Sequence, residues 1–230
     1  MTAGLQQLRL AALNIDGVLL NDTFSPVIHH FIVSRGGTYS ADLERRVFSQ
    51  PQLVAGREMA AAVSTEYTAE EALAAYFADR DQYLSEHPVL RMDGAVALLR
   101  RLRSLGLDVV CYGGLGKEHF DRHLGDLADY FDGPEYVCTN DFRPGIREIT
   151  TQIFDLKAEQ VLFVDDVAAV AAEARTFGAA FVGLPSSFPH SHQRTLMHEV
   201  GVRHLIASLD DLDEALLRTL DAEAGTGTLW

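Results

Sequence analysis

Short apolar runs alternate with helical patterns along most of this chain, and this alternation constrains the fold more than any other feature. The apolar runs end abruptly in polar or glycine-rich segments, as buried strands do. The segments between them carry apolar residues three and four positions apart, which is typical of helices that cover a sheet. Strands joined by such helical crossovers pair in parallel. The sequence therefore predicts the α/β class, with a Rossmann-like parallel sheet between helices.

The predicted elements follow directly from these patterns. The apolar runs that predict strands are Leu8–Asn14, Leu107–Cys111, Glu135–Cys138, Val161–Val164, Ala179–Val182 and Arg203–Ile206. The periodic segments that predict helices are Gly94–Leu105, Pro144–Phe154, Val167–Phe177 and Leu209–Leu220. The last residues, Ala222–Trp230, are expected to be frayed.

One long stretch, from Phe24 to Pro88, breaks the alternation because it has no convincing β run. It contains helix candidates at Pro26–Arg35, Ala41–Phe48 and Thr68–Ser85. Thr68 and Glu71 match a capping box at the start of the third candidate. An all-helical block between the first two strands predicts a helical cap, residues 24–88, inserted into an α/β core made of residues 1–23 and 89–230.

Charge and hydropathy exclude several classes of partner. The 230 residues carry a net charge of −14, which repels nucleic acids and anionic membrane surfaces. No apolar stretch approaches the ~20 residues of a membrane span, and the first ten residues lack a signal-peptide pattern. We therefore expect a cytoplasmic protein that binds a small molecule. Apolar faces on the cap helices and on Leu209–Leu220 could pair with a second copy or another protein.

The chain has two cysteines, Cys111 and Cys138, and both lie in predicted strands. In a chain expected to be cytoplasmic, such a pair is interpreted as two buried thiols rather than a disulfide.

Acidic residues and glycines stand where the predicted strands end. Asn14 and Asp16 follow the first strand, the Gly113–Gly116 loop follows the second, and Asp165 and Asp166 follow the fourth. The carboxyl ends of parallel strands meet at one edge of a sheet, where ligands bind. Converging carboxylates repel one another unless a cation lies among them, and oxygen ligands suit Mg²⁺. We therefore expect a magnesium site formed by Asn14, Asp16, Asp165 and Asp166.

A phosphate or other anion is expected beside that metal. Gly113 and Gly114 offer backbone N–H groups at the start of a predicted helix, and Lys117 lies in its first turn. Arg143, just before Pro144, supplies a further cation at the same edge.

Four segments in order resemble the motifs of the haloacid-dehalogenase-like (HAD) superfamily, in the form that carries a helical cap after the first strand (C1 type). Asn14–Val18 is similar to the first motif, Asp-x-Asp-Gly-Thr/Val. The segment Gly106–Gly114 is similar to the second-motif strand and Phe142–Pro144 to the third motif. Val164–Asp166, with Glu173–Ala179 after it, is similar to the fourth motif and its helix.

The resemblance implies a role for each matching residue. In active members, the first aspartate of the first motif attacks phosphorus to form an aspartyl-phosphate, and the second acts as acid and base. Asp16 matches the acid/base and Arg143 matches the charge-neutralising lysine. Asp165 and Asp166 match the Mg²⁺ ligands.

Two positions depart from the family pattern. Asn14 stands where the nucleophilic aspartate belongs, and loss of a nucleophile typically costs on the order of 10⁴–10⁶ in rate. Gly113 stands where a threonine or serine holds a phosphoryl oxygen. An engineered Asp→Asn substitution would account for Asn14 alone, so the change at Gly113 favours a natural departure.

Two functions remain open at this point. The favoured one is a HAD-like protein whose Mg²⁺/phosphate site is degenerate, so that it binds a phosphorylated or anionic molecule, or acts in a regulatory or non-standard role, without aspartyl-phosphate chemistry. The alternative is a Mg²⁺-dependent phosphatase of a small phosphometabolite, seen here as an inactivated variant. A structural protein without a ligand is the third class. Whether the chain is an enzyme is left open.

The histidines give weaker signals. His119 and His123 are four apart on a predicted helix and are interpreted as solvated side chains rather than metal ligands. The segment His190–His192 is interpreted as a surface turn, and one of His29 and His30 is expected to pack inward.

Overall fold

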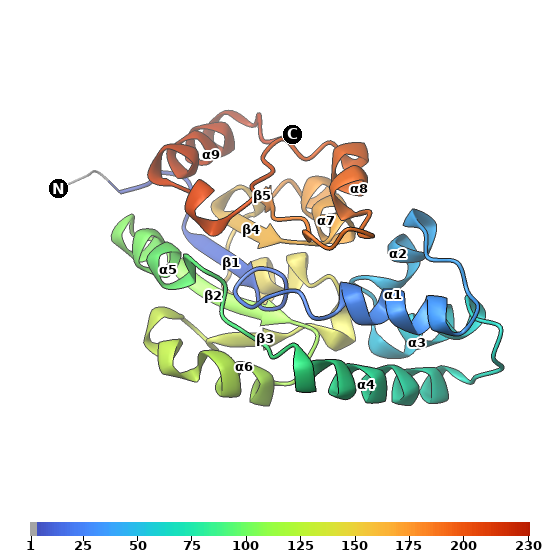
Figure 1. Ribbon diagram of the computed structural model, residues 1–230. Coiled ribbons are helices and arrows are strands. Elements are labelled where there is room, and N and C mark those ends of the chain that lie inside the picture. Colours follow the sequence, from blue (N-terminus) through green and yellow to red (C-terminus); the bar gives the residue numbers. More distant parts are fainter. Residues whose placement is uncertain (1–3) are drawn as a thin grey trace.

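The computed structural model describes residues 4–230, and its centre is a five-stranded parallel sheet in the order β3-β2-β1-β4-β5 (Figure 1). The strands are β1 (Leu10–Asn14), β2 (Asp108–Gly113), β3 (Tyr136–Cys138), β4 (Val161–Asp165) and β5 (Ala180–Gly183). Five of the predicted strands are thereby confirmed. The sixth, Arg203–Ile206, forms only an isolated bridge, through Leu205 to Gly183.

Alternation along each strand places its apolar side chains on both faces of the sheet. Ala11 and Leu13 of β1 belong to one buried cluster and Leu10 and Ala12 to the other. The first cluster is covered by α5 (Ala95–Ser104), α6 (Lys117–Leu124) and α9 (Glu214–Thr226). The second is covered by α7 (Ala168–Phe177), α8 (Gln193–Val200) and the π-helical turn η3 (Glu148–Ile153). Short 3₁₀ turns complete the core at η1 (Gly125–Tyr130), η2 (Asn140–Phe142), η4 (Ala158–Gln160) and η5 (Leu209–Asp211).

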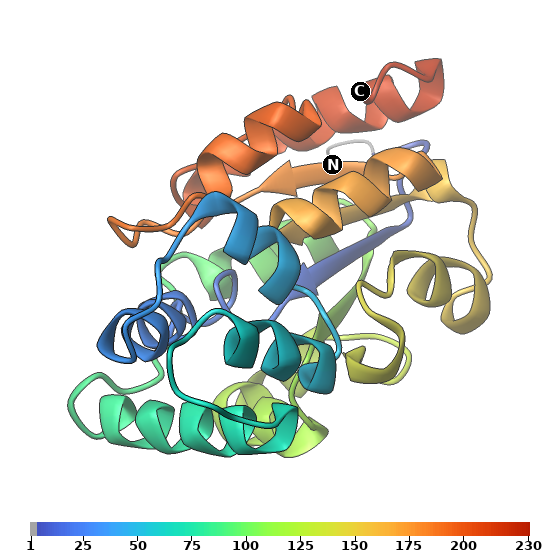
Figure 2. The ribbon, with the colours of Figure 1, turned by 90° about the vertical axis from the view of Figure 1, so that its right-hand side faces the viewer.

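The helical cap consists of α1 (Ser25–Ser34), α2 (Ala41–Val47), α3 (Gln52–Ala61) and α4 (Ala69–Glu86). In Figure 1 these helices lie beyond the arrowheads of the strands, and in Figure 2, turned by 90°, they stand in front of the sheet. The Thr68–Glu71 capping box is confirmed, because each side chain bonds the backbone N–H of the other residue. Helix α3 has no counterpart among the predicted helices, because it begins after Pro51 without a side-chain cap and buries only Gly56 and Met59.

Two expectations about helices at the end of the chain were wrong. The segment Leu209–Leu220 is not one helix, because η5 ends at Asp211 and α9 begins only at Glu214. The side chain of Asp213 caps α9 by accepting a hydrogen bond from the N–H of Leu216 (2.8 Å). The tail is not frayed, because α9 continues to Thr226 and the Trp230 indole donates to the carbonyl of Ala179 (3.0 Å).

Both cysteines are free thiols, as expected, but only Cys111 is buried. The expectation of a buried thiol at Cys138 was wrong, because this last residue of the edge strand β3 faces outward. None of the helices formed by residues 4–230 has the length and hydrophobicity needed to cross a membrane.

Candidate ligand site between the cap and the sheet

A cavity of about 140 Å³ lies between the cap and the carboxyl ends of the strands, and we call it the cap pocket. The sheet side contributes five polar residues and one glycine: Asn14, Asp16, Asn140, Arg143, Asp166 and Gly114. The cap side contributes mainly apolar residues: Phe24, Ile28, Val47, Phe48, Ala55, Met59, Leu73, Tyr76 and Phe77, with Ser49, Gln50 and Gln52 among them. The remaining wall residues are Asp22, Leu115 and Val167. This is the position at which a parallel α/β sheet binds ligands.

The amide of Asn14 joins the ends of β1 and β4. Its Nδ2 donates to the backbone carbonyl of Asp16 (2.7 Å) and to Oδ1 of Asp166 (2.9 Å). Both partners are acceptors, so the nitrogen rather than the oxygen of the amide must face them. A glycine at position 17 lets Asp166 come this close, because a Cβ there would lie 2.3 Å from Oδ2 of Asp166. The φ of Gly17 is +86°, a conformation that glycine adopts without strain. The carboxamide therefore bridges two oxygens that the sequence predicted as metal ligands.

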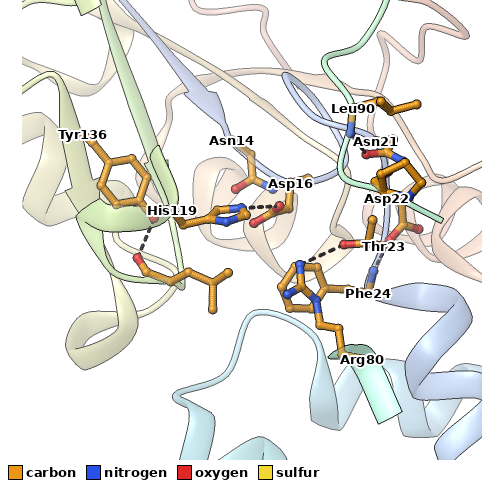
Figure 3. A network of polar contacts seen from close by, with 12 residues as sticks. Asn14, Asp16, Asn21, Asp22, Thr23, Phe24, Arg80, Leu90, His119 and Tyr136 are labelled. Atoms are coloured by element: carbon orange, nitrogen blue, oxygen red, sulfur yellow. Dashed lines mark hydrogen bonds and ion pairs between the residues drawn. The ribbon is translucent and has the colours of Figure 1, made fainter. Parts of the chain in front are cut away.

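Asp16 is held by a histidine from α6. His119 Nε2 lies 2.9 Å from Oδ1 of Asp16, and Figure 3 shows the two side chains facing each other. His119 is buried, so its interpretation as a solvated side chain was wrong. The signal for it was its place in the first turn of the helix that follows the Gly113–Gly116 loop, at the same edge of the sheet as Asp16.

Asp165 and Asp166, although adjacent, have different surroundings. Tyr112 donates its hydroxyl to Oδ2 of Asp165 (2.6 Å), and the N–H of Val167 bonds Oδ1 (2.8 Å). Asp165 is therefore turned to the sheet, whereas Asp166 lines the cap pocket. Burial raises the pKa of Asp165 to about 6, against the opposing effect of the Tyr112 bond. Burial and the neighbouring charge of Asp165 raise the pKa of Asp166.

Arg143 enters the cap pocket from the segment before η3. Its Nη1 lies against Gly114, where a Cβ would be only 2.4 Å away. Within residues 4–230 the guanidinium has no hydrogen bond or ion pair, and it is the one Lys or Arg side chain in the pocket wall. Its positive charge favours the ionised form of the nearby Asp165, which lowers the pKa of that carboxyl, but the two side chains are not hydrogen-bonded. The N–H groups of Arg143 are therefore available to an anionic ligand.

Of the other expected anion-binding residues, Gly114 lines the cap pocket, whereas Gly113 and Lys117 do not. Gly113 is packed, because a Cβ would lie 2.5 Å from Cγ2 of Ile15, so a serine or threonine has no room. Lys117 is half-exposed outside the cap pocket and pairs with Asp121 (2.6 Å) and Glu135 (3.2 Å).

The residues expected to hold Mg²⁺ do not fit the ion as they are arranged. Asn14 presents its N–H₂ group to the Asp16 carbonyl and to Asp166, and an N–H group cannot ligate a cation. The carboxylate of Asp165 is taken by Tyr112 and that of Asp16 by His119. Across residues 4–230, no three His, Cys, Asp or Glu side chains converge in a metal-binding cluster.

Compared by sequence, the chain matches no family model and no curated protein. Solved structures do match its fold. A phosphonoacetaldehyde hydrolase-like protein from Oleispira antarctica superposes with a TM-score of 0.70 at 13% identity, covering 99% of this chain and 97% of that one. A HAD family hydrolase from Deinococcus radiodurans, with bound phosphate and sodium, gives 0.62 at 18% identity, covering 95% and 97%. The chain has the HAD-like fold.

The likeness extends to the cap. A predicted phosphoglycolate phosphatase from Haemophilus somnus also superposes, with a TM-score of 0.64 at 17% identity, over 91% of this chain and 98% of that one. Coverage this complete includes the sheet and the helices inserted after β1. The HAD-like fold with a helical cap, which the sequence predicted, is thereby confirmed.

The raised pKa of Asp165 predicts a loss of stability as the pH increases. Because its pKa is higher in the folded than in the unfolded chain, the stabilising contribution is complete below about pH 4 and is lost as the pH rises through about 6. We expect this residue to lower the free energy of unfolding by up to about 3 kcal/mol between these limits. Urea denaturation across a pH series in EDTA measures it. The pKa of Asp166 is also raised and adds a loss of the same sign, so the Asp165→Asn variant should show a weaker pH dependence than the wild type. An unchanged profile in the variant would contradict the assignment.

Proposed function

We propose that this protein binds a small anionic molecule in the cap pocket and does not form an aspartyl-phosphate. The observation that carries the proposal is the state of position 14. Its side chain is an uncharged amide whose nitrogen bonds Asp16 and Asp166, and an amide oxygen is a much weaker nucleophile than a carboxylate. A bound phosphate or carboxylate would therefore be held rather than cleaved.

Arg143 supplies the attraction for the anion. Its planar guanidinium can bond two oxygens of a phosphate or carboxylate at once. Its charge acts on the nearby Asp165 carboxylate, but no described acid forms a hydrogen bond or an ion pair with it. The apolar cap side chains make the opposite wall a low-polarity surface, which strengthens a charge-assisted bond in the pocket. Asp16 stays oriented through His119, so it does not take the anion's place beside Arg143.

The packing at position 113 supports the loss of phosphatase activity through more than one change, rather than through the substitution at position 14 alone. Ile15 occupies the space that a hydroxyl-bearing side chain would need. A return to aspartate at position 14 alone would therefore leave the phosphoryl-binding hydroxyl missing. The alternative, a Mg²⁺-dependent phosphatase, requires both features.

Binding of inorganic phosphate and of acetate in EDTA tests the proposal by isothermal titration calorimetry. We expect saturable binding of at least one of them and a loss of about tenfold or more in affinity for Arg143→Gln, since charge-assisted bonds contribute about 1.5–3 kcal/mol. Arg194→Gln, at an exposed arginine outside the cap pocket, is the matched control and should bind as the wild type does. Equal affinity in the Arg143 variant would refute the proposal.

A further inference from the structure

We propose that the ligand of the cap pocket has a small apolar body, about the size of one aromatic ring, with an oxyanion at one end and a hydrogen-bonding group at the other. This inference rests on the proposed function and adds the chemical class of the ligand. It excludes a polyhydroxylated sugar phosphate as the preferred ligand.

The apolar body follows from the wall that the cap provides. Ile28, Val47, Met59, Leu73 and Phe77 face the pocket from all four cap helices. Hydroxyl groups of a sugar would lose their water against these side chains and gain no hydrogen bond in return. An apolar ring or branched chain would instead be transferred favourably from water.

The size of the body follows from the volume. The cap pocket measures about 140 Å³. An engineered protein cavity of about 150 Å³ accepts benzene, so a single ring is the appropriate scale. The oxyanion would lie at Arg143, on the polar side of the pocket.

The hydrogen-bonding group follows from polar atoms that lack partners. Within residues 4–230 six buried side-chain N or O atoms have none, and three of them belong to residues that line this pocket: Ser49, Tyr76 and Arg143. Buried polar groups in folded proteins are nearly always bonded, so this concentration indicates that a ligand supplies the missing partners. Arg143 accounts for the oxyanion, and the hydroxyls of Ser49 and Tyr76 account for a second polar group.

Ser49 also has an unusual backbone. Its φ is 58°, the left-handed region that non-glycine residues rarely adopt, and it lies in the short link between α2 and α3. A glycine would adopt this conformation without strain, yet the position carries a buried hydroxyl. Strained residues of this kind cluster at ligand-binding positions.

Titration calorimetry with a matched set of probes tests the inference. Phenyl phosphate and phenylacetate are expected to bind about tenfold or more tightly than β-glycerophosphate, because burial of the ring is favourable. The tighter of the two identifies the oxyanion as phosphate or carboxylate. Addition of a para-hydroxyl to that probe should increase its affinity about fivefold, as a new neutral hydrogen bond does.

Variants assign this gain to the two hydroxyls. Tyr76→Phe and Ser49→Ala should abolish the preference for the para-hydroxyl probe while leaving the thermal midpoint unchanged, since neither hydroxyl bonds a described residue. Tyr83→Phe, on the same helix but outside the cap pocket, should retain the preference.

The possible failures are distinguishable. If β-glycerophosphate binds as tightly as phenyl phosphate and still requires Arg143, the ligand class is wrong and the proposed function stands. If no anion binds, including inorganic phosphate, the proposed function fails as well. A para-hydroxyl preference that survives in the Ser49 or the Tyr76 variant overturns the assignment of that residue.

Discussion

Replacement of Asn14 by aspartate is expected to make the stability of this protein depend on a divalent cation. The change removes the two N–H bonds that join the Asp16 carbonyl to Asp166, and it adds a carboxylate to a site that already contains Asp16, Asp165 and Asp166. In EDTA we expect the free energy of unfolding to fall by about 3 kcal/mol or more, because acceptors are left unpaired and like charges meet. Millimolar Mg²⁺ should restore much of the loss, since the cation can ligate the same oxygens.

Denaturant unfolding with and without Mg²⁺ measures the effect. The wild type should respond little to the cation, because its amide already bridges the two oxygens. Asn14→Ala is the control, since it removes the bridge without adding charge; it should be destabilised but not rescued. A wild type that gains as much stability from Mg²⁺ as Asn14→Asp would show that the amide does not take the place of the cation.

The same aspartate variant decides between the two functions. If the protein is a phosphatase that has lost only its nucleophile, Asn14→Asp should raise Mg²⁺-dependent hydrolysis of a phosphate monoester by on the order of 10⁴ or more. We expect a far smaller gain, because the packing of Ile15 against Gly113 leaves the second departure in place.

Glu44 is expected to be the side chain whose removal most weakens the attachment of the cap to the core. It lies on α2 and is 1% exposed. One oxygen accepts bonds from the Tyr39 hydroxyl (2.7 Å) and the His192 N–H (2.9 Å), and the other accepts from the Gln193 amide (2.8 Å). Glu44→Ala would leave three donors unpaired in a buried place. We expect a loss of about 3 kcal/mol in the free energy of unfolding.

An ion pair between cap and core provides the comparison. Arg45, the next residue of α2, pairs with Glu199 of α8 (2.5 Å), but both side chains are about half exposed. Glu199→Gln should therefore cost at most about 1 kcal/mol. Urea denaturation of both variants tests the difference. Equal losses would mean that burial does not decide the strength of this attachment.

Much of the candidate site was predictable because it follows the ends of strands. β1 and β4 are neighbours in the sheet, so residues just after them had to meet whatever the details of packing. That reasoning correctly brought Asn14 and Asp16 together with Asp166. It failed for Lys117, since a first-turn position on a helix does not specify which way a long side chain points.

Other contacts of the site had no local signal. Tyr112 reaches Asp165 because its strand is two positions away in the sheet and its ring spans the gap. Glu44 bonds the start of α8 across nearly 150 residues of sequence, and nothing in the α2 segment identifies it as buried.

The sequence by itself determined the parallel sheet, the helical insertion after its first strand and the absence of a charge at position 14. These features depend on residue identity and on the periodicity of apolar residues, and both can be recognised within a short segment of the chain. Only the tertiary structure decided that the nitrogen of Asn14 faces its neighbours. The orientation of an amide depends on the groups around it. Two acceptors fix the orientation of Asn14, the Asp16 carbonyl and the Asp166 carboxylate, and Asp166 lies 152 residues further along the chain.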